Sequence, residues 1–168
     1  ASQVNNLIER PTHPQFAVEQ LTQQVKPGMQ YFLSSADITG AYFCYPLQEG
    51  PQGGDLTCFL THRGKYVFKV LPQGCRVSQD FLGTTLSQVL DHEDLRDDHN
   101  KGCIRIIDDI ATYSKDLPTF KRMTEALFTQ CKEYNVKLQP SKFQFSTEQI
   151  NFAGVVISKE GVQPDPER

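Results

Sequence analysis

Two adjacent carboxylates, Asp108 and Asp109, lie between two short β-prone runs at residues 103–107 and 110–113. The runs are rich in isoleucine, so the pattern predicts a β-hairpin with the acids at its tip. Aspartate is common in tight turns because it tolerates positive φ angles, and a purely structural turn is therefore one interpretation. A functional site is the other, because an apolar hairpin has no local use for two adjacent carboxylates.

A third carboxylate, Asp37, follows a short apolar run at residues 30–35 that is predicted to be a strand. If this strand lies beside the hairpin in one sheet, Asp37 and Asp108 meet at one edge. Two or three carboxylates there would repel one another unless a divalent cation lay between them. Magnesium suits such oxygen ligands, because it binds through a few carboxylates together with substrate phosphates. Two ions about 4 Å apart would hold the attacking and leaving oxygens of a phosphoryl transfer.

The elements that must position these acids follow from apolar spacing and turn signals. Three segments show helical spacing of apolar residues: 14–25, 78–90 and 118–134. In the second helix, Ser78 is the expected N-cap and Phe81 is expected in the core. Three segments are predicted strands: 30–35, 142–145 and 152–158. A second hairpin joins residues 58–60 to 66–71, and the charged stretch 91–101 is predicted to be a surface loop. This order predicts an α+β fold, with an antiparallel sheet backed by helices on one face and the acids on the other.

Length and composition fit one ordinary globular domain, with 168 residues, 38% hydrophobic and 22% charged. No apolar run approaches the roughly 20 residues of a membrane helix, and no signal sequence is recognisable. The five cysteines are scattered and form no CxxC pair, which favours reduced core residues of an intracellular protein. The net charge of −3 is unusual for a protein that binds nucleic acid, since lysine and arginine normally drive phosphate binding.

Four motifs, taken in order, resemble those of reverse transcriptases. They are residues 36–43 (ADITGAYF), 71–74 (LPQG), 107–110 (IDDI) and 152–154 (FAG). Each is short enough to occur by chance, but four in the family's order and spacing are a specific signal. The resemblance extends from residue 11 to residue 168. Residues 161–167 (GVQPDPE) resemble the branch of gypsy-type retrotransposons and retroviruses.

The resemblance implies the palm of an RNA-directed DNA polymerase with a remnant of the fingers, from a retroelement polyprotein. Residues 1–168 are expected to form a single fingers/palm fragment in which fingertips, thumb and RNase H are absent. In the parent enzyme, a primer 3′-hydroxyl would attack the α-phosphate of a deoxynucleoside triphosphate. The absent parts carry much of the basic surface of such enzymes, which would explain the acidic balance. The fragment alone is expected to have little or no polymerase activity.

By resemblance, Asp37, Asp108 and Asp109 are the catalytic and metal-binding residues, and Asp109 is the less critical of the pair. They would bind two Mg²⁺ ions, for which Mn²⁺ could substitute, and the Ile38 carbonyl would be a further ligand. The implied contacts to the incoming nucleotide are Ile38, Gly40, Ala41, Tyr42, Gln73, Gly74 and Lys142.

Each of these assignments has a plainer alternative. Tyr42 resembles the aromatic residue that packs under the sugar and excludes a 2′-hydroxyl, and a core aromatic is the alternative. Lys142 resembles the lysine near the leaving pyrophosphate, where a cation could neutralise charge or donate a proton, and a solvated surface lysine is the alternative. Residues 152–154 resemble the primer-grip hairpin, or else form a packed strand. Three departures remove no metal ligand: Ile106 where an aromatic is usual, Gly40 where aspartate is frequent, and Ser78-Gln79 where Ser-Pro is frequent.

Two rival functions stay open. The chain could be a domesticated, catalytically inactive interaction module, although the intact acids argue against long decay. It could also be an RNA-dependent RNA polymerase, against which Tyr42 argues because a ribonucleotide enzyme must accommodate the 2′-hydroxyl. The expected partners are an RNA or DNA template with primer, deoxynucleoside triphosphates, and further polyprotein domains such as thumb and RNase H. No membrane contact is expected, and the expected location is intracellular, in the cytoplasm or a virus-like particle.

Overall fold

The computed structural model describes residues 21, 23–28, 30–51 and 54–166. The chain divides into two compact units, a smaller one of residues 1–13 and 40–86 and a larger one of residues 14–39 and 87–168. The helix predicted at residues 14–25 lies mostly outside the described residues, although Leu21, Gln23 and Gln24 are helical.

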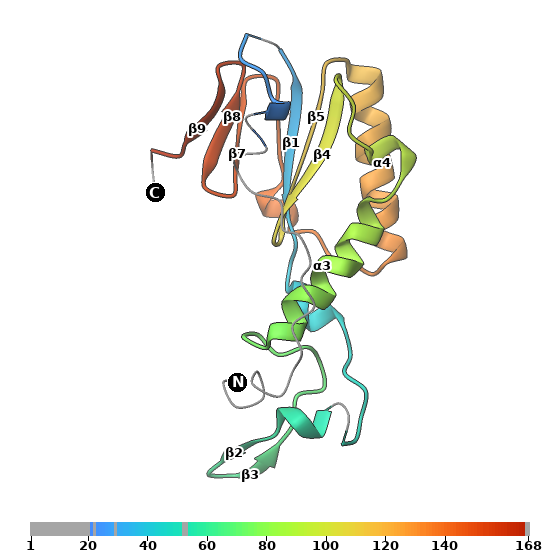
Figure 1. The fold of residues 1–168 in the computed structure, drawn as a ribbon, viewed down its shortest axis with the longest axis vertical. Coiled ribbons are helices and arrows are strands. Elements are labelled where there is room, and N and C mark those ends of the chain that lie inside the picture. The colour runs from blue at the N-terminus through green and yellow to red at the C-terminus, as the bar shows by residue number, and fades with distance from the viewer. Residues whose placement is uncertain (1–20, 22, 29, 52–53, 167–168) are drawn as a thin grey trace. The chain divides into compact units, whose positions relative to one another are not determined.

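The larger unit is built on a four-stranded antiparallel sheet with the strand order β4-β5-β1-β6 (Figure 1). Its strands are β1 (Phe32–Asp37), β4 (Lys101–Ile106), β5 (Asp109–Ser114) and β6 (Gln144–Ser146). The first strand therefore lies two residues later than the predicted 30–35, because β5 pairs with its backbone as far as Asp37.

One face of this sheet packs against α4 (Leu117–Glu133), which confirms the helix predicted at residues 118–134. The Asp116 side chain caps the helix by accepting a hydrogen bond from the Thr119 backbone N–H at 2.8 Å. Pro118 lies in the first turn, where its missing N–H is not needed. The Phe32 and Phe120 rings, 6.2 Å apart between centroids, join sheet and helix.

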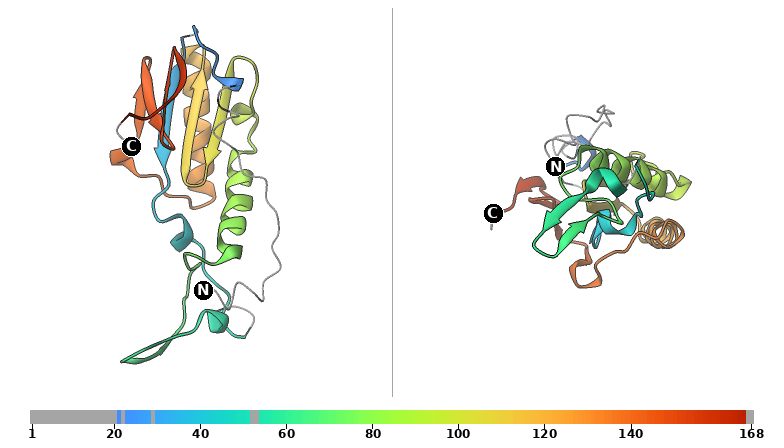
Figure 2. Two further views of the ribbon diagram at one scale, coloured as in Figure 1. Left: turned by 60° about the vertical axis from the view of Figure 1, so that its left-hand side comes forward. Right: turned by 90° about the horizontal axis from the view of Figure 1, so that it is seen from below.

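The opposite face packs against a second antiparallel sheet. Its strands are β7 (Gln149–Phe152), β8 (Val155–Ser158) and β9 (Gly161–Pro164). Successive side chains of a strand point to opposite faces, so Leu33 and Tyr113 point away from α4 and join Ile150, Phe152 and Ile157 in one buried cluster. Figure 2 shows the four-stranded sheet between α4 and this second sheet.

Two predicted strands need correction. The single strand predicted at residues 152–158 is wrong, because the chain reverses at Ala153 and Gly154, which have φ angles of 48° and 84°. Gly154 was the available signal for this turn, because glycine adopts positive φ readily, whereas alanine at position 153 does not. The strand predicted at residues 142–145 begins later than expected, since a 3-10 turn, η4 (Pro140–Lys142), precedes β6.

The smaller unit contains two 3-10 turns, a hairpin and most of a helix. They are η1 (Ala41–Cys44), η2 (Gly54–Thr57), β2 (Phe59–Thr61), β3 (Gly64–Tyr66) and α3 (Arg76–Leu90), whose last residues belong to the larger unit. A hairpin is present as predicted, but its second strand was misplaced, because β3 ends at Tyr66, where the predicted strand 66–71 begins. The predicted cap is wrong, because α3 begins before Ser78 and buries that hydroxyl without a hydrogen-bond partner. Phe81, expected in the core, is 46% exposed.

The loop at residues 91–101 contains a further 3-10 turn, η3 (Glu93–Leu95), whose Leu95 is buried. All five cysteine thiols are free, but Cys58 is exposed and Cys44, Cys75 and Cys103 are only partly buried, so the prediction of core cysteines holds fully for Cys131 alone. Among the described residues, the helices are too short or too polar to span a bilayer.

The two hydroxyls of Ser34 and Thr112 form a buried pair between β1 and β5, 2.7 Å apart and at most 2% exposed. Ser34→Ala or Thr112→Val should each lower the free energy of unfolding by about 1–3 kcal/mol, because each leaves a buried hydroxyl without its partner. The double variant should lose less than the sum of the two. Denaturant unfolding of the four proteins measures this coupling, and strict additivity would show that the pair contributes nothing.

Candidate active site

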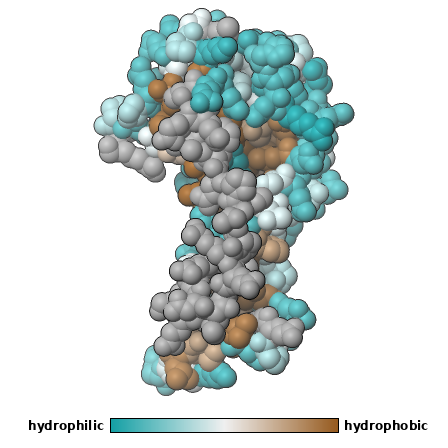
Figure 3. Space-filling model, viewed as in Figure 1, coloured by the Kyte–Doolittle hydropathy of each residue, from teal (hydrophilic) through white to brown (hydrophobic). Residues whose placement is uncertain are grey.

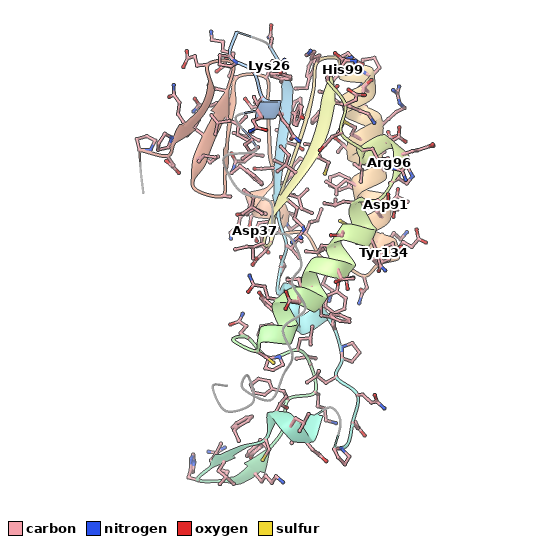
Figure 4. The ribbon with its side chains drawn as sticks, in the orientation of Figure 1. Lys26, Asp37, Asp91, Arg96, His99 and Tyr134 are labelled. Atoms are coloured by element: carbon pink, nitrogen blue, oxygen red, sulfur yellow. The ribbon has the colours of Figure 1, made fainter. Side chains whose placement is uncertain are left out.

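The ends of β1 and β5 bring the predicted acids together. Asp37, the last residue of β1, lies opposite Asp109, the first residue of β5. Directly opposed residues point to the same face of a sheet, which for these two is the face away from α4. Asp108 lies in the turn directly before Asp109. Its carbonyl accepts a hydrogen bond from the Ile38 N–H at 2.9 Å. The predicted convergence of carboxylates is therefore present in the backbone register; Figure 4 labels Asp37 at the end of β1.

The turn that carries the acids does not need aspartate for its shape. Its two residues are Ile107 and Asp108, and the positive φ angle of 56° belongs to Ile107. A β-branched residue in the left-handed region is strained, and such strain is often found at functional sites. The Arg105 guanidinium donates a hydrogen bond to the Ile107 carbonyl at 3.0 Å and thereby holds the turn. The purely structural interpretation of the paired acids consequently loses its basis.

Lys142 reaches the acids from a separate part of the chain. Its ammonium Nζ lies 2.8 Å from Asp37 Oδ2. This contact, followed by the charges of Asp37, Asp109 and Asp108, raises the pKa of Lys142 above its ordinary value. The preceding segment is fixed to β1, since the Gln139 N–H donates to the Asp37 carbonyl at 2.8 Å. The Lys142 side chain is 62% exposed, as the alternative of a solvated surface lysine requires, but it is also paired with Asp37.

The electrostatics of Asp108 reflect this crowding. Burial raises the pKa of its carboxyl above the ordinary value, and the neighbouring charge of Asp37 raises it further. The cations of Lys142 and Arg105 act in the opposite direction. A further positive charge near Asp108 would lower the pKa of its carboxyl, because such a charge favours the ionised form.

A cavity of about 330 Å³ opens beside the acids on the face away from α4. Asp37, Asp109 and Lys142 line one side of it, and Asn151 and the turn at residues 153–154 line the other. The segment that resembles a primer grip, residues 152–154, therefore lies at the same cavity as the acids. Phe152 is the buried last residue of β7, and Ala153 and Gly154 form the turn, so the segment combines a packed strand end with a hairpin turn.

The remaining predicted contacts belong to the smaller unit. Gly40 has a φ angle of 58° and precedes η1, in which Ala41 is buried and Tyr42 half-buried. Gln73 and Gly74 are exposed just before α3, and Gly74 has a φ angle of 81°. The left-handed conformations explain glycine at both sites, and the nucleotide-binding roles of these residues stay predictions.

Gln144 was not identified from the sequence. Its side-chain amide donates to the Asn151 carbonyl at 3.3 Å and accepts from the Asn151 N–H at 3.0 Å. It thus ties β6 to β7 beside the cavity. The available signal was a polar residue, Gln144, within a predicted strand. Gln144 pairs with Ser35, and its hydrogen-bond partner lies in another sheet.

No group of three or more histidine, cysteine, aspartate and glutamate side chains is arranged to bind a metal ion in the part of the chain that the structure describes. The Lys142 ammonium contacts Asp37 instead. The donor set nevertheless fits a hard divalent cation, because carboxylates from two adjacent strands share one end of the sheet and already attract a positive charge.

Comparison with known proteins matches residues 2–157 to the family described as reverse transcriptase (RNA-dependent DNA polymerase). The chain is similar to the retrovirus-related Pol polyproteins of the Drosophila melanogaster transposons 297 (29% identical over 137 residues) and gypsy (26% over 141 residues). These alignments cover 82% and 84% of this chain, but only 12% and 13% of the polyproteins. The Gag-Pol polyprotein of Walleye dermal sarcoma virus is 24% identical over 98% of this chain and 9% of its own length.

Among solved structures, the fold is similar to the foamy viral protease-reverse transcriptase in complex with RNA/DNA hybrid, with a TM-score of 0.79 and 18% identity. It is also similar to the foamy viral protease-reverse transcriptase dRH in complex with double-stranded DNA, with a TM-score of 0.81 and 19% identity. Both comparisons cover 98% of this chain, but 21% and 27% of the other chains. The predicted α+β palm fold is thereby confirmed.

The pKa of Asp108 should respond in opposite directions to two substitutions. Asp37→Asn should lower it, because a repelling charge is removed, and Lys142→Met should raise it, because an attracting charge is removed. A pH titration of the carboxyl carbon signals by NMR measures both changes. Asp116 is the internal control, since its pKa is lowered by its hydrogen bond from Thr119 and should not move. Equal titration of Asp108 in all three proteins would contradict the convergence of these groups.

Proposed function

Because the chain belongs to the reverse transcriptase (RNA-dependent DNA polymerase) family, we propose that it forms the catalytic palm and part of the fingers of an enzyme that copies an RNA or DNA template into DNA. The observation that carries the proposal is the meeting of Asp37, Asp108 and Asp109 at one end of β1 and β5, with a lysine cation on Asp37. The chain spans about an eighth of the retrotransposon polyproteins that it resembles, so activity, substrates and partners belong to this proposal.

The three aspartates would hold two divalent cations, with the Ile38 carbonyl as a further ligand. When bound, magnesium would lower the pKa of a primer 3′-hydroxyl and neutralise the charge on the reacting phosphates. The chain's own contribution is a rigid placement of the carboxylates, which the β1–β5 register and the Ile38–Asp108 hydrogen bond provide. The backbone positions of the acids would need little change when metal binds, whereas their side chains must turn toward the cation and Asp37 must release Lys142.

Lys142 would act on the leaving side of the reaction. In the absence of metal it neutralises Asp37, and a cation bound to that carboxylate would displace the ammonium. The freed ammonium lies at a cavity with Asp37 and Asp109, where it could bind or protonate a leaving pyrophosphate. A lysine ammonium is protonated at neutral pH without the Asp37 contact, as a general acid requires.

The choice of deoxynucleotides would rest on Tyr42, whose aromatic ring would exclude a 2′-hydroxyl. Ribonucleotide incorporation by the unaltered protein would instead identify the RNA-dependent RNA polymerase that the sequence leaves open. The further partners in this proposal are a primer–template and the thumb and RNase H domains of a longer polyprotein. The location in this proposal is the cytoplasm or a virus-like particle.

Metal binding separates a catalytic palm from an inactive interaction module. Saturable Mn²⁺ binding to this chain, measured by calorimetry, should be lost in Asp37→Asn and in Asp108→Asn because each removes a ligand. Lys142→Met should bind Mn²⁺ more tightly, because the competing cation is gone. Asp91→Asn is the matched control, since this exposed acid pairs with Arg96 away from the cluster. Binding that all four variants leave unchanged would favour the inactive module.

Polymerase activity tests the roles of the acids directly. In a longer protein that joins this chain to fingertips and a thumb, Asp37→Asn and Asp108→Asn should each lower the rate of deoxynucleotide incorporation by at least about 10³-fold, since metal stabilisation is worth several kcal/mol. Asp109→Asn should lower it less. Primer extension on an RNA template is the measurement. Retained activity in Asp37→Asn or Asp108→Asn would refute the proposed mechanism.

A further inference from the structure

Gln144 joins two segments that line the cavity beside the acids. One is the segment of Lys142, whose Nζ lies 2.8 Å from Asp37 Oδ2. The other is β7, whose Asn151 precedes the turn at residues 153–154 by two positions. All of these residues line the cavity. The Gln144–Asn151 pair therefore connects the side of the cavity that carries the acids with the side that carries the turn.

The geometry of the Gln144–Asn151 pair is that of two neighbouring strands. β7 is an edge strand in the sheet order β7-β8-β9, so β8 can pair with the peptide groups on one side of it only. The Asn151 N–H donates to Gln144 Oε1 at 3.0 Å, and the Asn151 carbonyl accepts from Gln144 Nε2 at 3.3 Å. One side-chain amide thus satisfies both backbone groups of one residue. The Gln144 amide takes the place of a peptide group in a neighbouring strand.

Apolar packing alone does not fix the position of β7 along the four-stranded sheet. Ile150 and Phe152 of β7 are buried in the cluster shared with β1, and the surface that the larger unit presents in Figure 3 is mainly hydrophilic. The burial of apolar surface is non-directional, so it holds β7 against the sheet without a sharp preference for one position. Hydrogen bonds are directional and weaken steeply when their angle is lost. The Gln144–Asn151 pair therefore supplies a constraint that packing lacks.

The turn follows Asn151 because it belongs to the same small sheet. Asp165, just after β9, donates its N–H to the Gly154 carbonyl at 3.2 Å, which holds the turn to the end of β9. In the proposed function, a primer end would lie in the cavity between this turn and the acids. We propose that Gln144 is a positioning residue, which fixes the turn relative to Asp37 and thereby places the primer 3′-hydroxyl beside the carboxylates. This role rests on the proposed function.

The first experiment tests the Gln144–Asn151 pair in the 168-residue chain, without metal or nucleic acid. Gln144→Met keeps the length of the side chain and removes both hydrogen bonds. The Asn151 N–H should then exchange with solvent about 5-fold faster, as expected for the loss of ordinary hydrogen bonds. Gln149→Met is the matched control, because Gln149 is an exposed glutamine at the end of β7 that is remote from the turn. NMR measures the exchange, and thermal unfolding checks that each variant is folded.

The second experiment tests positioning in a longer protein that joins this chain to fingertips and a thumb. Gln144→Met should lower the single-turnover rate of primer extension by about 10-fold, because a displacement of about 1 Å at the reacting atoms can cost up to about 10²-fold. The KM for the deoxynucleotide should stay the same, since most residues predicted to contact it belong to the smaller unit. Gln149→Met should extend primers at the unaltered rate.

The single-turnover experiment separates positioning from a merely structural role. A structural role would reduce the fraction of the enzyme that reacts, whereas a positioning role slows the reaction of the whole folded fraction. Mn²⁺ binding to the 168-residue chain should be the same with and without Gln144→Met, because Gln144 is not among the proposed metal ligands.

Two outcomes would overturn the positioning role. One is an exchange rate of the Asn151 N–H that Gln144→Met leaves unchanged. The other is an unchanged single-turnover rate in Gln144→Met, with or without a smaller reacting fraction, while the unaltered longer protein extends primers. An unaltered longer protein that extends no primer would instead refute the proposed function, and the positioning role with it.

Discussion

The register of β1 against β5 is the constraint on which the site depends. Asp37 faces Asp109 only if Phe32 pairs with Ser114 and each following residue keeps step. A slip of one residue would turn Asp37 toward α4. It would also move every side chain of the strand to the opposite face of the sheet. Different chemistry on the two faces of β1 prevents this slip. Leu33 belongs to the cluster shared with β7 and β8, whereas Ser34 is bonded to Thr112 on the other face.

The same register makes the site electrostatically unfavourable by itself. It brings like charges together at a partly buried strand end, and Ile107 is strained in the turn. The pKa of Asp108 lies above its ordinary value, so its contribution favours folding most at low pH. That contribution is lost as the pH rises through the folded-state pKa. Lys142 and Arg105 lower this repulsion but do not remove it. A sequence selected for stability alone would avoid this arrangement, which is why it is better explained by chemistry than by folding.

Local signals in the sequence were sufficient where local physics decides the structure. The 117–133 helix has an N-cap, a first-turn proline and one apolar face, and its bounds came out within one residue of the prediction.

The acids were visible because carboxylates are rare in apolar strands. Long-range contacts were not visible. The Lys142–Asp37 pair joins residues 105 positions apart, and Gln144 is explained only by its partner in another sheet. Ala153 adopts a positive φ angle, which is not expected for alanine.

In the sequence, the acidic net charge argued against nucleic-acid binding. This argument is weaker once the positions of the charges in the structure are known. Association with a polyanion depends on the local field and not on the sum over the chain. The negative charge of the larger unit includes the three carboxylates near the ends of β1 and β5. Without metal these carboxylates would repel phosphates, and with a bound divalent cation the same place would attract them. The β2–β3 hairpin carries only cations between Phe59 and Lys69. With a divalent cation bound, the strand end that contributes to the negative net charge would thus become a place that attracts the phosphates of a nucleic acid.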